Sequence, residues 1–135
     1  MNKIYDFVKS KSYSFLLDCT FSKYEQAAKN VQLSLDKRRL VVIQYVIQPP
    51  EIAWQFTQDR ELVDGRNIRR EDFIEQFIAA RDTVSAVKDK FGEQVRVDLI
   101  ERNLQSGRYK INFNVSNLDR YLPKKYSKDE IEKLI

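Results

Sequence analysis

The 135-residue sequence contains no histidine, one cysteine and only three glycines. Without histidine the chain has no His-based catalytic triad, and it lacks both the usual proton shuttle near neutral pH and the commonest ligand of zinc and copper. The single cysteine, Cys19, excludes an internal disulfide and a multi-cysteine metal site. Acid–base chemistry would have to come from carboxylates, lysine or tyrosine, and no metal site is predicted.

Long apolar runs and blocks of like charge are also missing. No apolar run approaches the roughly 20 residues of a transmembrane helix, and the first twelve residues, MNKIYDFVKSKS, are too polar for a signal peptide. We therefore expect a cytoplasmic protein without membrane association. The 24 basic and 20 acidic side chains leave a net charge of +4 that is scattered along the chain, which supports only a mild affinity for anions. With no basic block or aromatic platform, nucleic-acid binding is disfavoured.

The composition that is present, 42% hydrophobic and 33% charged, is typical of a globular protein. A length of 135 residues fits a single domain over residues 1–135. The apolar run YSFLLD (13–18) predicts a strand buried on both faces, and LVVIQYVI (40–47) predicts the strongest strand, placed centrally in a sheet.

Helix signals separate these strands. A short helix is predicted over residues 2–11. Two Ser-x-x-Glu motifs, Ser22 to Glu25 and Ser127 to Glu130, predict helices that begin with capping boxes. Another helix is expected after the Pro-Pro pair at 49–50, and a long amphipathic one over residues 70–91, ending at a glycine.

Residues 95–102 and 108–115 alternate apolar and polar side chains around the loop NLQSG, which predicts a β-hairpin. The order of elements favours an α/β layered fold with a mainly parallel sheet and a C-terminal hairpin. Ligands of such sheets bind beyond the carboxyl ends of the strands. Asp18 lies at one such end and Gln48 at the next.

Several short segments, taken in order, resemble a known family. FLLDCTFSKYEQAAKNVQ, LVVIQYVIQPPEIAWQFTQDRE, GRNIRREDFIEQF and VSNLDRYLPKKYSKDEIEKL together resemble the C-terminal half of zeta-toxin-like kinases. These are P-loop proteins of toxin–antitoxin systems that phosphorylate a UDP-N-acetylamino sugar, such as UDP-N-acetylglucosamine, and are commonly held by an epsilon-type antitoxin. The resemblance implies a truncated P-loop kinase fold, ATP and Mg²⁺ as cofactors, and an antitoxin-like partner.

The resemblance also implies roles for four residues. Asp18 matches the carboxylate at the end of the substrate-facing strand, and Thr20 matches the hydroxyl beside it. Arg60 and Arg66 match two phosphate-contacting arginines, a role that suits a planar, bidentate guanidinium. If these roles hold, all four side chains should converge on one concave surface. The competing structural picture ties each arginine to an acidic neighbour and points it into solvent.

The sequence departs from the family in three places. The phosphate-binding motif G-x-x-x-x-G-K-[ST] is absent. No aspartate matches the catalytic base of the family, and Cys19 stands where the family has a glycine. We therefore expect no kinase activity from this chain alone and no cofactor bound by it, with Met1 marking either a fragment start or a natural remnant.

Two classes of function follow. The first is part of a sugar-nucleotide kinase whose partner is a missing N-terminal half. The second is a non-catalytic α/β interaction domain for a protein partner. An uncovered sheet edge would also favour a homodimer.

Overall fold

A computed structural model describes residues 2–11, 13–103, 105–122 and 124–135, without the side chains of Asn2, Tyr5 and Lys9. Leu104, in the predicted hairpin loop, lies outside the described residues. The elements are α1 (Asn2–Ser10), α2 (Tyr24–Asp36), β1 (Val41–Ile47), α3 (Pro50–Asp64), α4 (Arg70–Phe91), η1 (Gly92–Gln94), β2 (Val95–Arg102), β3 (Tyr109–Asn112), η2 (Leu118–Arg120) and α5 (Lys128–Leu134). The predicted α/β class is confirmed.

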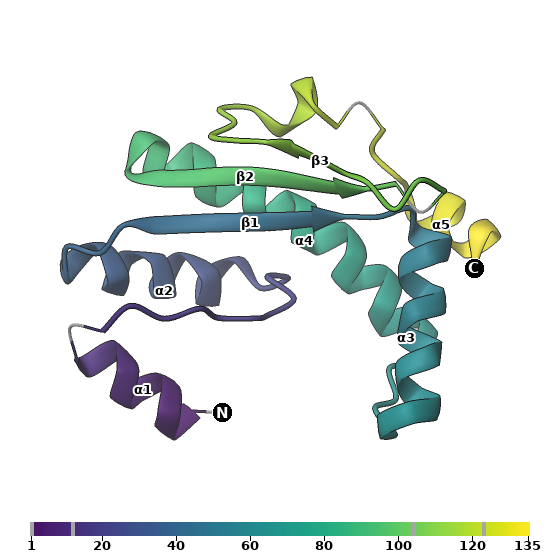
Figure 1. Ribbon diagram of the computed structural model, residues 1–135, viewed down its shortest axis with the longest axis horizontal. Helices are drawn as coiled ribbons and strands as arrows, with labels where there is room; N and C mark the ends of the chain where they lie inside the picture. The colour runs from purple at the N-terminus through teal and green to yellow at the C-terminus, as the bar shows by residue number, and fades with distance from the viewer. Residues whose placement is uncertain (1, 12, 104, 123) are drawn as a thin grey trace.

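The sheet of the described residues has three strands in the order β1-β2-β3. β1 pairs with β2 in parallel, and β2 pairs with β3 antiparallel, so the predicted hairpin is confirmed. The expectation that residues 40–47 lie centrally is wrong, because β1 occupies an edge (Figure 1). Its side chains alternate between half-buried and exposed, which is typical of a strand covered on one face.

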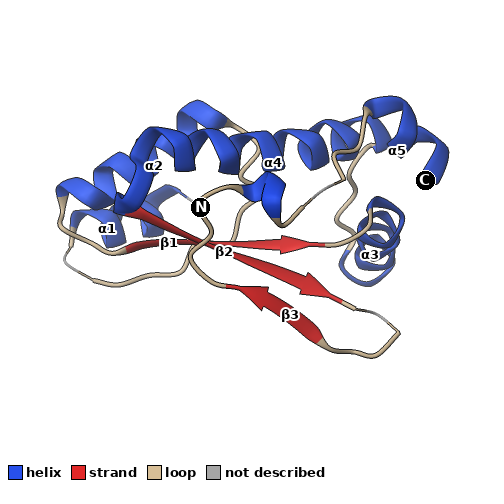
Figure 2. Cartoon of the chain, turned by 90° about the horizontal axis from the view of Figure 1, so that it is seen from above, coloured by secondary structure: helices blue, strands red, loops and turns tan. Residues whose placement is uncertain are grey.

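Helices α2 and α4 cover one face of this sheet and leave the other uncovered (Figure 2). Alternation along β2 sends Val95, Val97 and Leu99 toward the helices, where all three are 0% exposed. They meet small and branched side chains of α2 and α4, including Ala28 and Val84. On the uncovered face, apolar side chains from β1 and from β3 and its extension stay exposed, among them Val46, Ile111 and Phe113.

A second core joins α3, α4 and α5. The rings of Trp54 and Phe73 lie 5.1 Å apart, and Phe77 stands edge-on to Tyr126 at 6.2 Å. Ile131 of α5 is fully buried against this cluster. The predicted capping box of α5 is confirmed, because Ser127 accepts from the backbone N–H of Glu130 and Glu130 accepts from that of Ser127.

Proline and glycine set the other helix ends as predicted. α3 begins at Pro50, where the missing N–H has no intrahelical role. α4 ends before Gly92, whose φ of 57° lies in the left-handed region that side chains with a Cβ avoid.

The amino-terminal expectations are partly wrong. α1 forms as predicted, but residues 13–18 form no strand, and Leu16 is 87% exposed. The capping box at Ser22 is absent: α2 begins at Tyr24 after Lys23, which makes no side-chain cap. The Ser22 hydroxyl instead lies 3.1 Å from that of Thr20.

The backbone just before α2 and the chain around α1 explain this outcome. Phe21 has a φ of 52°, which breaks the extended geometry before Ser22 can cap the helix. The side chains of Lys37 and Arg39 donate to carbonyl oxygens at the end of α1, so residues 13–18 start beside the amino end of β1. No strand of the described chain pairs with them there.

No helix in the described part of the chain is both long enough and apolar enough to cross a bilayer.

Candidate functional site

The predicted substrate residues lie in the irregular segment that precedes α2. Asp18 and Thr20 are both exposed. Thr20 contacts the Ser22 hydroxyl, whereas Asp18 has no hydrogen bond or ion pair to any described residue. The Asp18 carboxylate is therefore open to a ligand, but nothing in its surroundings orients it.

The predicted phosphate residues lie at the far end of α3. Gly65, with a φ of 71°, ends this helix in the left-handed conformation and donates its N–H to the Glu61 carbonyl. The turn brings Arg66 back toward Asp64, at 3.6 Å between the Arg66 Nε and the carboxylate. Arg60 is exposed and makes no polar contact with the described residues.

These two regions lie on the same side of β1 in Figure 1 and share no polar contact between described residues. Figure 1 shows α3 leaving the carboxyl end of β1 at a steep angle, toward the side on which residues 13–22 run beside α2. Among the described residues, no hydrogen bond or ion pair joins Asp18 or Thr20 to Arg60 or Arg66. Convergence of the four side chains on one ligand stays a prediction, and for Arg66 the local pairing with Asp64 is the contact that forms.

Neither of two hollows on the described surface includes any of the four residues. One, of about 400 Å³, lies between α2 and α4 and is lined by Tyr24, Lys29, Leu33 and Lys90 among others. The other, of about 50 Å³, lies at the carboxyl end of β1. It is far smaller than the several hundred cubic ångströms of a typical ligand pocket, so it cannot enclose a nucleotide sugar.

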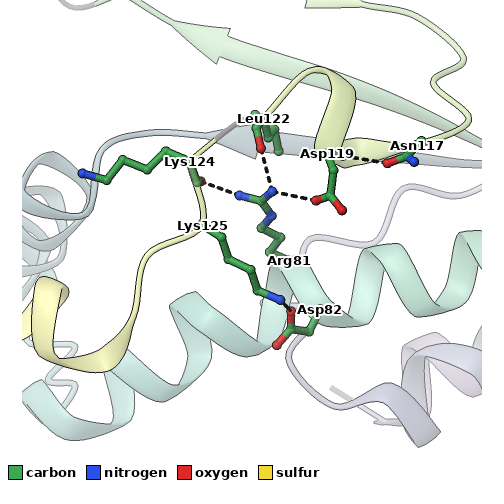
Figure 3. A network of polar contacts seen from close by, with 7 residues as sticks. All are labelled: Arg81, Asp82, Asn117, Asp119, Leu122, Lys124 and Lys125. Atoms are coloured by element: carbon green, nitrogen blue, oxygen red, sulfur yellow. Dashed lines mark hydrogen bonds and ion pairs between the residues drawn. The ribbon is translucent and has the colours of Figure 1, made fainter.

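The smaller hollow borders a polar network that the sequence analysis missed. Arg81 of α4 donates to the carbonyl oxygens of Leu122 and Lys124 and to the carboxylate of Asp119 (Figure 3). Its side chain is only 12% exposed. Because protein oxygens already take up these guanidinium donors, Arg81 fastens the C-terminal segment to α4 and does not recruit an external anion.

A second contact supports the same segment. Lys125 pairs with Asp82 at 2.9 Å, next to Arg81 in the sequence (Figure 3). Burial raises the pKa of the Tyr45 hydroxyl, which lines the hollow; the positive charge of Arg81 opposes that shift, and Asp82 adds to it. Tyr45 therefore stays protonated at neutral pH.

One sequence signal points to Arg81. It follows Phe77 by four positions and so falls on the apolar stripe of the predicted helix over residues 70–91. A cation on such a stripe must either be paired or leave the core.

The ATP and Mg²⁺ implied by the resemblance can be tested against the residues present. No group of three or more His, Cys, Asp or Glu side chains within the described chain is arranged to hold a metal ion. The three glycines, Gly65, Gly92 and Gly107, each occupy a separate turn with positive φ and form no phosphate loop. The described residues therefore provide no phosphate loop for ATP.

In a comparison with known protein families, the model of the family described as "Zeta toxin" matches residues 1–114. Comparison with curated proteins and with solved structures gave no match. The family match takes in β1, α3 and α4 and all four predicted site residues. The chain therefore belongs to the zeta toxin family, a family of kinase-like toxins.

Proposed function

We propose that this chain supplies the sugar-nucleotide side of a zeta-toxin-like kinase and does not transfer a phosphoryl group from ATP by itself. Its ligand would be a UDP-N-acetylamino sugar. The observation that carries the proposal is the family match over residues 1–114. Within it, the exposed Asp18 and Arg60 make no polar contacts with the described residues and so remain available to a ligand.

Each proposed role follows from the chemistry of the side chain. Arg60 and Arg66 would bind the diphosphate, because a guanidinium donates two parallel hydrogen bonds to phosphate oxygens. Binding would have to displace Asp64 from Arg66, a small cost for an exposed pair 3.6 Å apart. Asp18 and Thr20 would orient the sugar by accepting from and donating to its hydroxyl groups.

The proposed inactivity follows from the missing phosphate loop. Catalysis of phosphoryl transfer is almost entirely positioning and charge stabilisation of the γ-phosphoryl group. No G-x-x-x-x-G-K-[ST] motif occurs in the 135 residues to provide that positioning. A chain that binds the acceptor and lacks this loop would need the loop from outside these 135 residues.

The test measures binding and turnover separately. Titration calorimetry with UDP-N-acetylglucosamine should show binding that weakens about tenfold in Arg60→Ala and in Arg66→Ala, since each loses a charge-assisted bidentate contact. Arg108→Ala is the matched control, because Arg108 is an exposed arginine outside the proposed site. Equal affinities for all three variants would contradict the assignment of the arginines.

Turnover is measured with ATP, Mg²⁺ and the same sugar nucleotide. We expect none above the rate without protein. Phosphorylation of the sugar that disappears in Asp18→Asn would show that the chain is an autonomous kinase and would overturn the proposed inactivity.

A second candidate function is a non-catalytic interaction domain that binds a protein partner, such as an antitoxin-like chain. One specific observation favours it. Val46, Ile111 and Phe113 are 57%, 44% and 63% exposed on the uncovered face of the sheet. Exposed apolar side chains that gather on one face of a sheet mark interaction surfaces.

A further inference from the structure

The edge of β1 that faces away from β2, here called the β1 edge, has unused backbone hydrogen-bonding groups. The Val97 carbonyl accepts from Val115 N–H on the β3 side of β2, at 2.8 Å. Because backbone groups alternate sides along a strand, those of Asp98 point toward β1. The register pairs Asp98 with Gln44, and a residue in a parallel ladder bonds to the two neighbours of its partner.

The outward groups of β1 can therefore be named. Asp98 bonds to Ile43 and Tyr45, so the N–H and C=O of Gln44 point away from β2. The same reasoning applies two residues either way, to Val42 and Val46. The described chain has no strand on that side to pair with them, and unpaired edges of this kind are templates for strand addition.

The other edge of the sheet carries two sequence features that discourage pairing. β3 has four residues and carries Lys110, which pairs with Glu101 of β2. β1 has seven residues, VVIQYVI, without a charge or a proline. Short length and lysine are two of the ways in which natural edges avoid pairing, and β1 uses neither. A partner strand should therefore choose the β1 edge.

We propose that the β1 edge accepts one extended strand from a separate protein chain by backbone pairing with Val42, Gln44 and Val46. A second copy of this chain fits poorly. Figure 1 shows residues 13–22 running beyond the β1 edge, where the sheet of a second copy would have to continue. A lone strand needs less room, and it would cover part of the exposed side chains of Val42 and Val46.

Charge and direction define the partner further. Lys37 and Arg38 are exposed at the amino end of β1, and the Lys37 contact with Ser10 brings Lys11 close to them. β2 runs parallel to β1, and residues 13–18 run in the same direction (Figure 1). The partner strand is accordingly parallel and apolar, and it is preceded by acidic residues that meet this basic end.

This inference deepens the second candidate function and does not depend on sugar binding, so either can fail while the other stands. The probe is a capped peptide of two glutamates followed by alternating valine and threonine. Hydrogen exchange followed by NMR should slow at least about tenfold at the amides of Val42, Gln44 and Val46 when the peptide is added. Exchange at the β3 amides of Tyr109 and Ile111 should not change.

Two controls address the backbone directly. A peptide methylated on alternate amide nitrogens keeps its side chains but loses the donors of one edge, and it should give no protection. Gln44→Pro removes an N–H that faces away from the sheet, a position at which an edge strand tolerates proline, and should weaken peptide binding about tenfold, whereas Gln44→Thr should not.

Several outcomes overturn the proposal. One is the absence of protection at any soluble concentration of the unmethylated peptide. A second is protection at β3 in place of β1, and a third is equal protection by the methylated peptide. A dimer in sedimentation that Gln44→Pro converts to a monomer would assign the β1 edge to a second copy and would likewise reject a separate partner chain.

Discussion

Residues 13–25 and residues 95–130 contain the same local signals and fold differently. Each region has an apolar run that includes or ends on an aspartate, followed by a Ser-x-x-Glu motif. In the first region the run is irregular, with Leu16 87% exposed, and the serine does not cap its helix. In the second the run is β2, with Leu99 fully buried, and the capping box of α5 forms.

Neighbouring elements account for the difference. β2 has a strand on each side and α4 over one face, so its backbone is paired and its side chains are covered. α5 is anchored by the buried Ile131 one residue after its capping glutamate. Residues 13–18 have no paired strand within the described chain. An apolar run forms a strand, or a capping motif starts a helix, only where neighbouring elements pair with its backbone or bury its side chains.

The largest expected contrast is between the two leucines. Leu99→Ala should lower the free energy of unfolding by about 3 kcal/mol, because it leaves a cavity between the sheet and its helices. Leu16→Ala should change it by less than about 0.5 kcal/mol, as expected for an exposed side chain. Urea denaturation followed by circular dichroism measures both. Similar losses in the two variants would show that residues 13–18 are packed in solution.

A smaller contrast is expected between the two aspartates. Asp98 is 2% exposed and accepts hydrogen bonds from Arg96 Nε and from the N–H of Asn114. Asp98→Asn should cost about 2 kcal/mol, since it weakens contacts to a charged acceptor. Asp18→Asn should leave stability unchanged, because Asp18 is exposed and makes no polar contact within the described chain.

The buried Asp98 also predicts that the free energy of unfolding depends on pH. Burial alone would raise the pKa of Asp98, but the bonds from Arg96 and Asn114 outweigh it and hold that pKa below its ordinary value. A carboxylate with a lowered folded-state pKa contributes stability above its unfolded pKa of about 3.9 and loses it as the pH falls through the folded value. Unfolding titrations from pH 6 downward should show a steeper loss for the unmodified chain than for Asp98→Asn. Parallel curves would contradict this assignment.

The smallest contrast separates the two serines. Ser127→Ala should cost about 1 kcal/mol, because it removes the acceptor for the Glu130 N–H at the start of α5. Ser22→Ala should cost close to nothing, since Ser22 does not cap α2. Thermal unfolding of the two variants tests the difference, and an equal shift for both would mean that Ser22 caps α2 in solution.

Much of the fold followed from local pattern. The periods of α4 and β2, the strand over residues 40–47, the proline that opens α3 and the glycine that ends α4 each depend on a few residues, and each of these elements forms as predicted. The candidate site followed less well. The four site residues were predicted by family resemblance: Asp18, Thr20, Arg60 and Arg66. Whether they converge depends on whether α3 and the segment before α2 bind the same ligand.

The sequence by itself determined the α/β class, the order of nearly all the elements and the family, because hydrophobic period and turn chemistry are encoded locally. Only the tertiary structure decided that β1 lies at an edge, that residues 13–18 stay unpaired and that Arg81 fastens the C-terminal segment. Each of these features depends on which segments, distant in the sequence, contact one another in the folded chain. A strand, a buried cation or a capped helix is stable only if a partner distant in the sequence satisfies its backbone, its charge or its apolar surface.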